Sequence, residues 1–200
     1  MSARPGAGTV DARTEPVPAD PTGAAGSLLV VRQAASADRD ALVSMFGRCT
    51  PETRYRRFHA PVKQIPERYL AEALSGNPLH YALVAGEANI ADTGQRASQA
   101  PGAEVRSPEI VALASCRLID EGAAELGVLI EDAWQRQGLG TSLVSDLIAH
   151  ATGIGLRVLK AQLLAEQAWI AGLLRPYGTC RVGLAWGGVL NVTLRLGQES

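Results

Sequence analysis

Aliphatic runs and helix-spaced apolar positions alternate along the chain. Short aliphatic runs bounded by turn residues are typical of buried strands, and apolar residues three or four positions apart are typical of helices. The predicted order of elements is β-α-α-α-β-β-β-α-β-α-β-β, which indicates a mixed α/β layered domain. Strands are expected at Leu28 to Val31, Tyr81 to Val84, Ile110 to Leu118, Ala124 to Ile130 and Arg157 to Leu164, and a C-terminal hairpin ends in a strand running to Leu196.

Local capping signals place the predicted helices. The first helix follows the first strand and ends near Cys49, and Thr50-Pro51-Glu52 then combines an N-cap hydroxyl, a first-turn proline and an early carboxylate. A third helix is expected to start at Pro66, and a last one runs from Glu166 to Leu174 before the next proline. Between them, one helix carries an apolar stripe formed by Leu139, Leu143, Val144, Leu147, Ile148 and Ala151.

Two segments have no apolar period. Residues 1–27 are rich in Pro, Gly, Ala and Thr, and cannot bury enough apolar surface to offset the entropy of ordering, so we expect a disordered N-terminal tail. Residues 86–108 are predicted to form a long loop insertion between two strands. Residues 28–200 are then long enough for a single domain with one core.

The charges nearly cancel, with 19 Lys and Arg against 20 Asp and Glu and a formal net charge of −1. No bulk positive field exists for a nucleic-acid backbone, so nucleic acid is not an expected partner. No stretch approaches the roughly 18 to 20 apolar residues that cross a bilayer, and the N-terminus lacks a basic-then-apolar secretory pattern. We therefore expect a soluble, cytoplasmic protein with no membrane partner.

The three cysteines, Cys49, Cys116 and Cys180, are far apart in the sequence. They form no Cys-x-x-Cys pair, and no histidine lies at zinc-ligand spacing, so no metal site is predicted. Buried, reduced thiols explain them. Cys116 lies in a predicted strand with no readable base nearby, so we interpret it as a packing residue and not as a nucleophile.

The segment from Glu125 to Thr141 carries the clearest chemical signal. A strand ends in a loop containing Gln135, Gly138 and Gly140, and an amphipathic helix follows at once. Unpaired N–H groups and the positive end of the helix dipole suit a pyrophosphate there, although the glycines alone would also suit a tight turn. No lysine follows Gly140 as a mononucleotide P-loop needs, and a dinucleotide fingerprint would need a third glycine where Leu143 stands.

Two motifs resemble a known family. Gln135-Arg136-Gln137-Gly138-Leu139-Gly140 resembles the Arg/Gln-x-x-Gly-x-Gly/Ala pyrophosphate loop of the GNAT acetyltransferase superfamily. Thr50 to Phe58 is similar to a Ser-Pro-Glu-x-x-Tyr-x-Arg-Phe segment in the acetyltransferase domain of bacterial protein-lysine acetyltransferases of the Pat type. The resemblance spans about Leu28 to Leu196, and it implies an α/β single domain with a mixed, mostly antiparallel central sheet flanked by helices, and acetyl-CoA as the donor.

The same resemblance assigns roles within the site. Ala124-Glu125 matches the family's Ala-Glu strand start, whose glutamate is the proposed general base, and strand alternation puts Gly127 beside it, leaving room for the carboxylate. A carboxylate there would take the proton that an ammonium acceptor must lose; without the resemblance, Glu125 could equally be an exposed strand carboxylate. The implied coenzyme-binding residues are Val128, Leu129, Ile130, Gln135, Arg136, Gln137, Gly138, Leu139, Gly140 and Thr141.

The chain also departs from the family. Many members carry Glu-Asn and, farther along the same helix, a tyrosine that protonates the leaving thiolate, whereas this chain has Glu166-Gln167 and Leu174 there. Tyr177 or water would have to serve as the acid. The expected function is acetyl transfer to a primary amine, with a protein lysine favoured. A small-molecule amine and a non-catalytic acyl-CoA-binding protein are the alternatives, and an open sheet edge would permit a homodimer.

Several polar residues remain with two interpretations. Arg54, Arg56, Arg57 and Arg68 could bind the 3′-phosphate of coenzyme A or an acidic acceptor, but a solvated helix face with ion pairs is the simpler interpretation. His59 and His80 titrate near neutrality, yet without a partner in sequence they are interpreted as structural. The tryptophans are expected to cover core edges.

Overall fold

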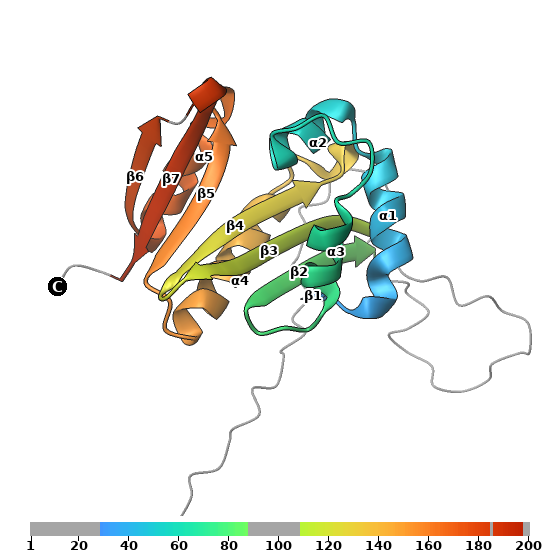
Figure 1. Cartoon of the computed structure of the whole chain (residues 1–200), viewed down its shortest axis with the longest axis horizontal. Coiled ribbons are helices and arrows are strands. Elements are labelled where there is room, and N and C mark those ends of the chain that lie inside the picture. Colours follow the sequence, from blue (N-terminus) through green and yellow to red (C-terminus); the bar gives the residue numbers. More distant parts are fainter. Residues whose placement is uncertain (1–28, 88–108, 185, 198–200) are drawn as a thin grey trace, which may run out of the picture.

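The computed structural model describes residues 29–87, 109–184 and 186–197. Seven strands form one sheet in the order β1-β2-β3-β4-β5-β7-β6 (Figure 1). Every neighbouring pair is antiparallel except β4 and β5, so the predicted mixed, mostly antiparallel sheet is confirmed. The strands are β1 (Leu29–Gln33), β2 (His80–Glu87), β3 (Ile110–Asp120), β4 (Ala123–Ile130), β5 (Val158–Leu164), β6 (Gly178–Leu184) and β7 (Val189–Leu196).

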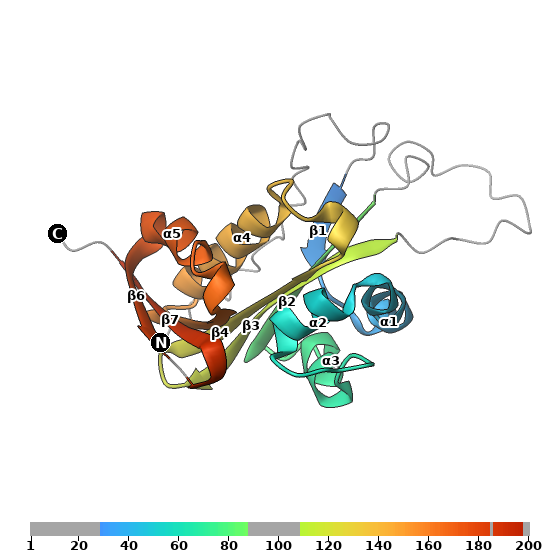
Figure 2. The same ribbon diagram turned by 90° about the horizontal axis from the view of Figure 1, so that it is seen from above.

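Helices cover both faces of the sheet. Figure 2 shows α1 (Arg39–Arg48), α2 (Pro51–Phe58) and α3 (Glu67–Leu74) on one face, and α4 (Leu139–Gly153) and α5 (Ile170–Leu174) on the other. Each face has its own aliphatic core cluster, and both clusters include buried strand residues. The predicted apolar stripe of α4 packs into one of these clusters. The predicted single domain is therefore a three-layer arrangement with the sheet in the middle.

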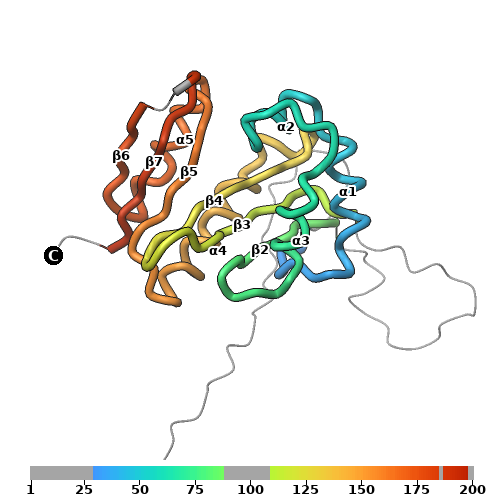
Figure 3. Tube along the Cα trace, viewed as in Figure 1, coloured from blue at the N-terminus to red at the C-terminus, as the bar shows by residue number. Residues whose placement is uncertain are grey.

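The two central strands separate along their length. β4 pairs with β5 only through Ala123 with Val158, Ala124 with Leu159 and Glu125 with Lys160. Beyond these residues the strands diverge, so that β1 to β4 form one arm of the sheet and β5 to β7 the other (Figure 3). The second half of β4 therefore has β3 on one side and no strand on its other edge, and alternate backbone N–H and C=O groups there are left for another partner.

The predicted order of elements is confirmed, with one element differing in form. The expected helix from Glu166 to Leu174 is a 3-10 turn at Ala165–Gln167, the short α5, and a second 3-10 turn at Arg175–Tyr177. Gly172 lowers helix propensity and Pro176 cannot continue an α-helix. Only Ala171 and Leu174 of α5 are buried, so little packing compensates for this weak propensity.

The start of the predicted loop also differs from the prediction. Gly86 and Glu87 belong to β2 and not to the loop, because Gly86 pairs with Ile110 of β3. The rest of the predicted loop, residues 88–108, and the predicted tail, residues 1–27, lie outside the described residues. Within the described ranges, no helix combines the length and apolar character that crossing a membrane requires.

Candidate active site

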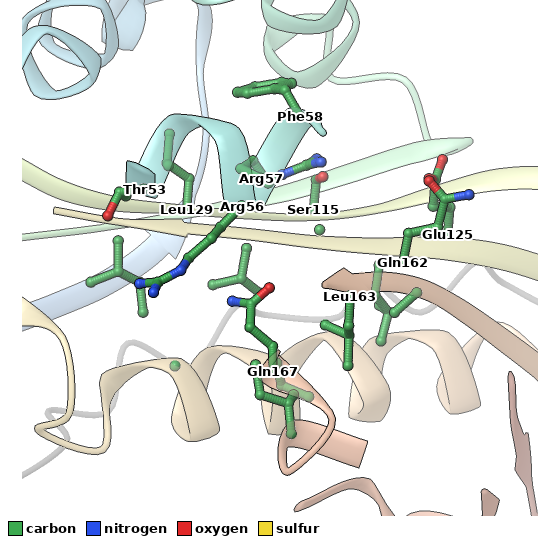
Figure 4. A pocket seen from close by; sticks show the side chains of 18 of the residues that line it. Thr53, Arg56, Arg57, Phe58, Ser115, Glu125, Leu129, Gln162, Leu163 and Gln167 are labelled. Atoms are coloured by element: carbon green, nitrogen blue, oxygen red, sulfur yellow. The ribbon is translucent and has the colours of Figure 1, made fainter. Parts of the chain in front are cut away.

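A cavity of about 1160 Å³ lies where β4 and β5 separate. Its lining comes from α2, β4, the loop before α4, β5 and α5 (Figure 4). Pockets for drug-sized ligands are usually about 300 to 1,000 Å³, so this one has room for a large ligand. The cavity brings Glu125 and the glycine loop, ten and more residues apart in the sequence, into one site.

The start of α4 forms an anion-binding terminus at one end of the cavity. Gly138 is the N-cap with φ +83°, a left-handed conformation that favours glycine, and Arg136 has φ +61°. The N–H of Ser142 donates to the Gly138 carbonyl as the helix begins, so the amide groups before it have no acceptor within the helix. Arg136 lines the cavity beside this positive helix end and adds a full charge to it.

The structure places eight of the ten predicted coenzyme-binding residues on the cavity wall. Gln137 and Leu139 are the two that do not line it: the Gln137 side chain donates to the Ala133 carbonyl at 2.8 Å, and Leu139 is buried in the core. The eight are Val128, Leu129, Ile130, Gln135, Arg136, Gly138, Gly140 and Thr141.

Gln135 holds the loop in shape with its side chain. Its amide donates to the Thr53 hydroxyl at 3.0 Å and to the Ile130 carbonyl at 2.9 Å. Thr53 is buried and belongs to α2, whereas Ile130 ends β4. The first residue of the glycine motif therefore connects the loop to the other motif, the segment around α2.

Asp132 makes the second connection between these motifs. Its carboxylate accepts hydrogen bonds from the Thr50 N–H, the Thr50 hydroxyl and the Thr53 hydroxyl, each at 2.8 Å. Burial alone would raise the pKa of this carboxyl, but the three hydrogen bonds outweigh it and lower the pKa. Thr50 is also the N-cap of α2, as predicted, because its side chain accepts from the Thr53 N–H.

Glu125 lines the cavity from β4 and has Arg117 as its partner. The Arg117 guanidinium lies 2.6 Å from the Glu125 carboxylate, and the two residues are directly opposite each other on β3 and β4. The Glu125 side chain is about one-third exposed, at 36%. An incoming cationic amine can therefore reach a carboxylate that is held in place and still open to the cavity.

The space beside Glu125 differs from the expectation. Gly127 was expected to leave room for the carboxylate, but a Cβ at Gly127 would overlap the guanidinium of Arg57. Arg57 fills this space from α2, and its Cζ lies 5.0 Å from the Phe58 ring centre and 4.9 Å from the Tyr69 ring centre. Figure 4 shows Arg57 over the strands beside Ser115. Because Gly127 has no side chain, the Arg57 guanidinium can lie against its backbone.

The other basic residues of this segment are partnered. Arg56 pairs with Glu52 and, across the cavity, with Glu166 at 3.2 Å. Arg68 pairs with Glu72 at 2.8 Å. The Arg54 guanidinium donates to the backbone carbonyls of Gly47 and Lys63. The ion-pair interpretation therefore holds for Arg56 and Arg68, but not for Arg54 or Arg57 among the described residues.

His59 and His80 both have a lowered pKa. His59 lines the cavity, and its pKa falls mainly through burial and then through the charge of Arg57. His80 is buried beside the Tyr69 ring, and burial is again the main cause of its lower pKa. Both imidazoles are therefore neutral at pH 7.

The remaining predictions concern packing residues and the missing acid. Burial raises the pKa of the Cys49 and Cys116 thiols to about 11, in agreement with the packing interpretation. Leu174 is buried and lies on the cavity wall, and Tyr177 lines the same wall. No group of three or more His, Cys, Asp or Glu side chains suited to a metal ion occurs in the part of the chain that the structure describes.

The sequence profile of the Acetyltransferase (GNAT) family matches residues 53–170, more than half of the chain. The chain belongs to the GNAT acetyltransferase family. The enzymes of this family use acetyl-CoA as cosubstrate, and this GNAT domain has the features that such a ligand needs. These are a large cavity, unpaired amides at the start of α4, and an open edge on the second half of β4.

Solved structures with the same fold include several GNAT proteins. The GNAT domain of S. lividans PAT aligns with a TM-score of 0.65 and 21% identity over 86% of this chain and 92% of that chain. Salmonella typhimurium yncA, solved with its cofactor acetyl-CoA, aligns with a TM-score of 0.57 and 20% identity over 86% and 96%. The cAMP-binding acyltransferase from Mycobacterium smegmatis aligns with a TM-score of 0.54 and 19% identity over 93% of this chain and 48% of that chain. No curated protein matches the chain.

Sequence reasoning missed three contributors to the site. Arg117 could have been found, because a hairpin with its turn at Glu121 and Gly122 brings Arg117 opposite Glu125. The contact of Asp132 with Thr53 gave no such signal, since the two residues lie 79 positions apart. The position of Arg57 against Gly127 could not be predicted from the sequence either, because it depends on how α2 lies over the sheet.

Proposed function

We propose that this GNAT domain transfers the acetyl group of acetyl-CoA directly to a primary amine, in a complex that holds both substrates. The observation that carries the proposal is the position of Glu125. Glu125 and the anion-binding start of α4 line the same cavity. Glu125 lies on the face of β4 that is turned toward α2. Donor and acceptor can thus meet at β4 from different sides.

The proposed acetyl-CoA site consists of backbone groups and one cationic side chain. The free amides at Gly138 to Thr141, with Arg136 beside them, suit the pyrophosphate. The open edge of β4 at Val128 to Ile130 suits the amide groups of the pantetheine arm, in the manner of an added strand. When bound, acetyl-CoA supplies a thioester whose carbonyl carbon is open to attack by a neutral amine.

Glu125 is the proposed general base. An ammonium group must lose a proton before its nitrogen can attack, and the Glu125 carboxylate accepts that proton directly or through one water. Arg117 orients the carboxylate through its 2.6 Å contact, which fixes the side chain at the cavity wall. His59 lines the same cavity, but burial and then the charge of Arg57 lower its pKa and so disfavour a proton on it.

A protein lysine is the proposed acceptor. Two observations support it: the α2 segment is similar to that of Pat-type enzymes, and the fold aligns with the GNAT domain of S. lividans PAT. The cavity is also open enough for a side chain to enter from a larger molecule, since Arg68 and Trp169 on its wall are largely exposed. A small-molecule amine is the alternative that the acceptor assay tests.

Calorimetric titration with acetyl-CoA is the first test, with ATP and NAD as controls. We expect acetyl-CoA alone to bind at micromolar strength. If acetyl-CoA does not bind, Gly138 and Gly140 serve only to form a tight turn, and the proposed function is wrong.

Glu125→Gln then separates an enzyme from a coenzyme-binding protein. Loss of the base should lower kcat by about 10² to 10⁴-fold with lysine peptides, because this is the usual contribution of general base catalysis. Acetyl-CoA affinity should stay within about twofold. Glu121→Gln, in the hairpin turn and outside the cavity lining, is the matched control and should keep full activity. A wild-type protein that binds acetyl-CoA but acetylates no amine would favour the non-catalytic alternative.

A further inference from the structure

Arg57 stands apart from the other cationic side chains at the acceptor end of the cavity. Arg56, Arg68 and Arg117 are each neutralised by a glutamate. Arg57 has no ion pair with any residue that the structure describes, and its buried Nε has no hydrogen-bond partner among them. The guanidinium therefore places a charge on the cavity wall that no described acid neutralises, and such a charge favours an anionic ligand, because leaving it unpaired costs free energy.

The surroundings of Arg57 fix its position without using its N–H groups. The Phe58 and Tyr69 rings flank the guanidinium at 5.0 and 4.9 Å, and Gly127 lies against it. The Tyr69 hydroxyl is itself hydrogen-bonded to Ser115 at 3.1 Å, which holds that ring in place. Stacking restrains a guanidinium but leaves its planar edge of donors free for a carboxylate. The side chain is therefore ordered before a ligand arrives, which lowers the entropy cost of binding.

The charge of Arg57 lies next to the proposed base. Gly127 and Glu125 are two positions apart on β4, so they share a face and their Cα atoms are separated by about 6.6 Å. The field of Arg57 also reaches His59 and His80, where it contributes to the lower pKa. An acceptor whose amine meets Glu125 therefore has a fixed cation on the same face of β4.

We infer that Arg57 is an anion subsite of the acceptor pocket, which selects amines that carry a carboxylate near the reacting nitrogen. The inference rests on the proposed function and narrows its substrate class. The carboxylate belongs either to a free amino acid or to an acidic residue beside the acceptor lysine in a protein. In both cases the carboxylate accepts two parallel N–H bonds from the guanidinium edge while the amine lies toward Glu125.

Two matched pairs of probes test the inference by calorimetry with the protein saturated with coenzyme A. Lysine and lysinamide form the small-molecule pair, and acetylated, C-terminally amidated Glu-Lys-Gly and Gln-Lys-Gly form the peptide pair. We expect one pair to show an acid preference of about tenfold to hundredfold, the usual range for a charge-assisted hydrogen bond. The pair that shows it identifies the source of the carboxylate. Equal binding of acid and amide in both pairs, or no saturable binding of any probe, would overturn the inference.

Variants connect the preference to Arg57. Arg57→Gln should abolish the acid preference, and Arg57→Lys should keep only part of it, because an ammonium lacks the planar fork. Gly127→Ala leaves the charge but displaces the guanidinium, and should weaken the preference as well. Arg181→Gln, on the exposed edge strand outside the cavity lining, removes one positive charge elsewhere and should change nothing.

Two further readouts separate the possible failures. Acetyl-CoA affinity and the thermal midpoint, measured for each variant, would detect a structural role for Arg57 in packing against the Phe58 and Tyr69 rings. If Arg57→Gln keeps the acid preference, the inference is wrong whatever its stability. Release of coenzyme A is measured separately: an acid preference without turnover supports the anion subsite and counts only against the proposed function.

Discussion

At the residue scale, Tyr177 is the candidate proton donor for the leaving thiolate, and a variant at this position tests whether the reaction needs one. The usual tyrosine position is occupied by Leu174, which is buried, and Tyr177 lines the cavity a few residues later. A thiol has an ordinary pKa of about 8.5, so its thiolate leaves tolerably well at neutral pH.

Tyr177→Phe is therefore expected to lower kcat by less than about tenfold, far less than Glu125→Gln. Acetyl-CoA affinity should stay unchanged, because the phenyl ring keeps its packing against the core. The measurement is steady-state release of coenzyme A at pH 7 and pH 9. A loss of a hundredfold or more at pH 7 would instead assign the acid role to Tyr177.

Single residues also show the limit of reasoning from the sequence. The helix start at Gly138 and Gly140 was foreseeable because helix capping acts over a few residues, whereas the role of Glu125 came from the family resemblance. Arg57 and Asp132 act through partners 70 or more positions away. No local pattern encodes such distances, so the contacts of Asp132 and the position of Arg57 against Gly127 appear only when the chain is folded, although Arg57 was already a candidate for binding an acidic acceptor.

At the scale of elements, Asp132 couples the loop before α4 to the start of α2. Asp132→Ala removes three hydrogen bonds and leaves the buried Thr53 hydroxyl with fewer partners. Unfolding free energy should fall by about 1 to 3 kcal/mol, and acetyl-CoA affinity should fall because the loop loses a support.

Urea unfolding and calorimetry of the same variants check this coupling. Asp132→Asn keeps one acceptor oxygen and should show an intermediate loss. A variant with wild-type stability but weaker acetyl-CoA binding would mean that Asp132 acts on the ligand directly and not through α2.

The elements themselves were largely predictable. Capping at Thr50 and the hairpin turn before β4 determine their own geometry, and both were foreseen. α5 was not, because a segment with Gly172 and little buried surface has no strong preference for one regular helix. The separation of β4 from β5 was not predicted, since neither strand carries a local signal for it.

At the scale of the whole molecule, buried titratable groups set the pH range of stability. All three histidines, His59, His80 and His150, have a pKa lowered mainly by burial. The unfolded chain therefore binds protons more readily than the native one as pH falls below about 6.5, and stability decreases there. The raised pKa of Cys49 and Cys116 has the opposite sign: above about pH 8.5 the unfolded chain loses protons that the native chain keeps.

We therefore expect the free energy of unfolding to be greatest between about pH 7 and pH 8 and to fall on both sides. Urea unfolding at constant ionic strength from pH 5 to pH 9.5 measures this profile. His150→Gln, far from the cavity lining, should reduce the slope below pH 6.5 if it folds normally. A flat profile between pH 5 and pH 7 would contradict the lowered histidine pKa values.

The narrow seam between β4 and β5 has a consequence for how the protein folds. Strands β1 to β4 pair in chain order, and β5 to β7 pair among themselves, so each arm can form its strand pairs without the other arm. Only three residue pairs join the strands of the two arms, and the cavity lies where β4 and β5 separate. The cleft exists only after the arms have docked. A ligand that contacts both arms binds only the docked form, so its full binding free energy stabilises the docked arms against their separation. The cosubstrate thus supplies contacts across the part of the sheet where β4 and β5 are not paired.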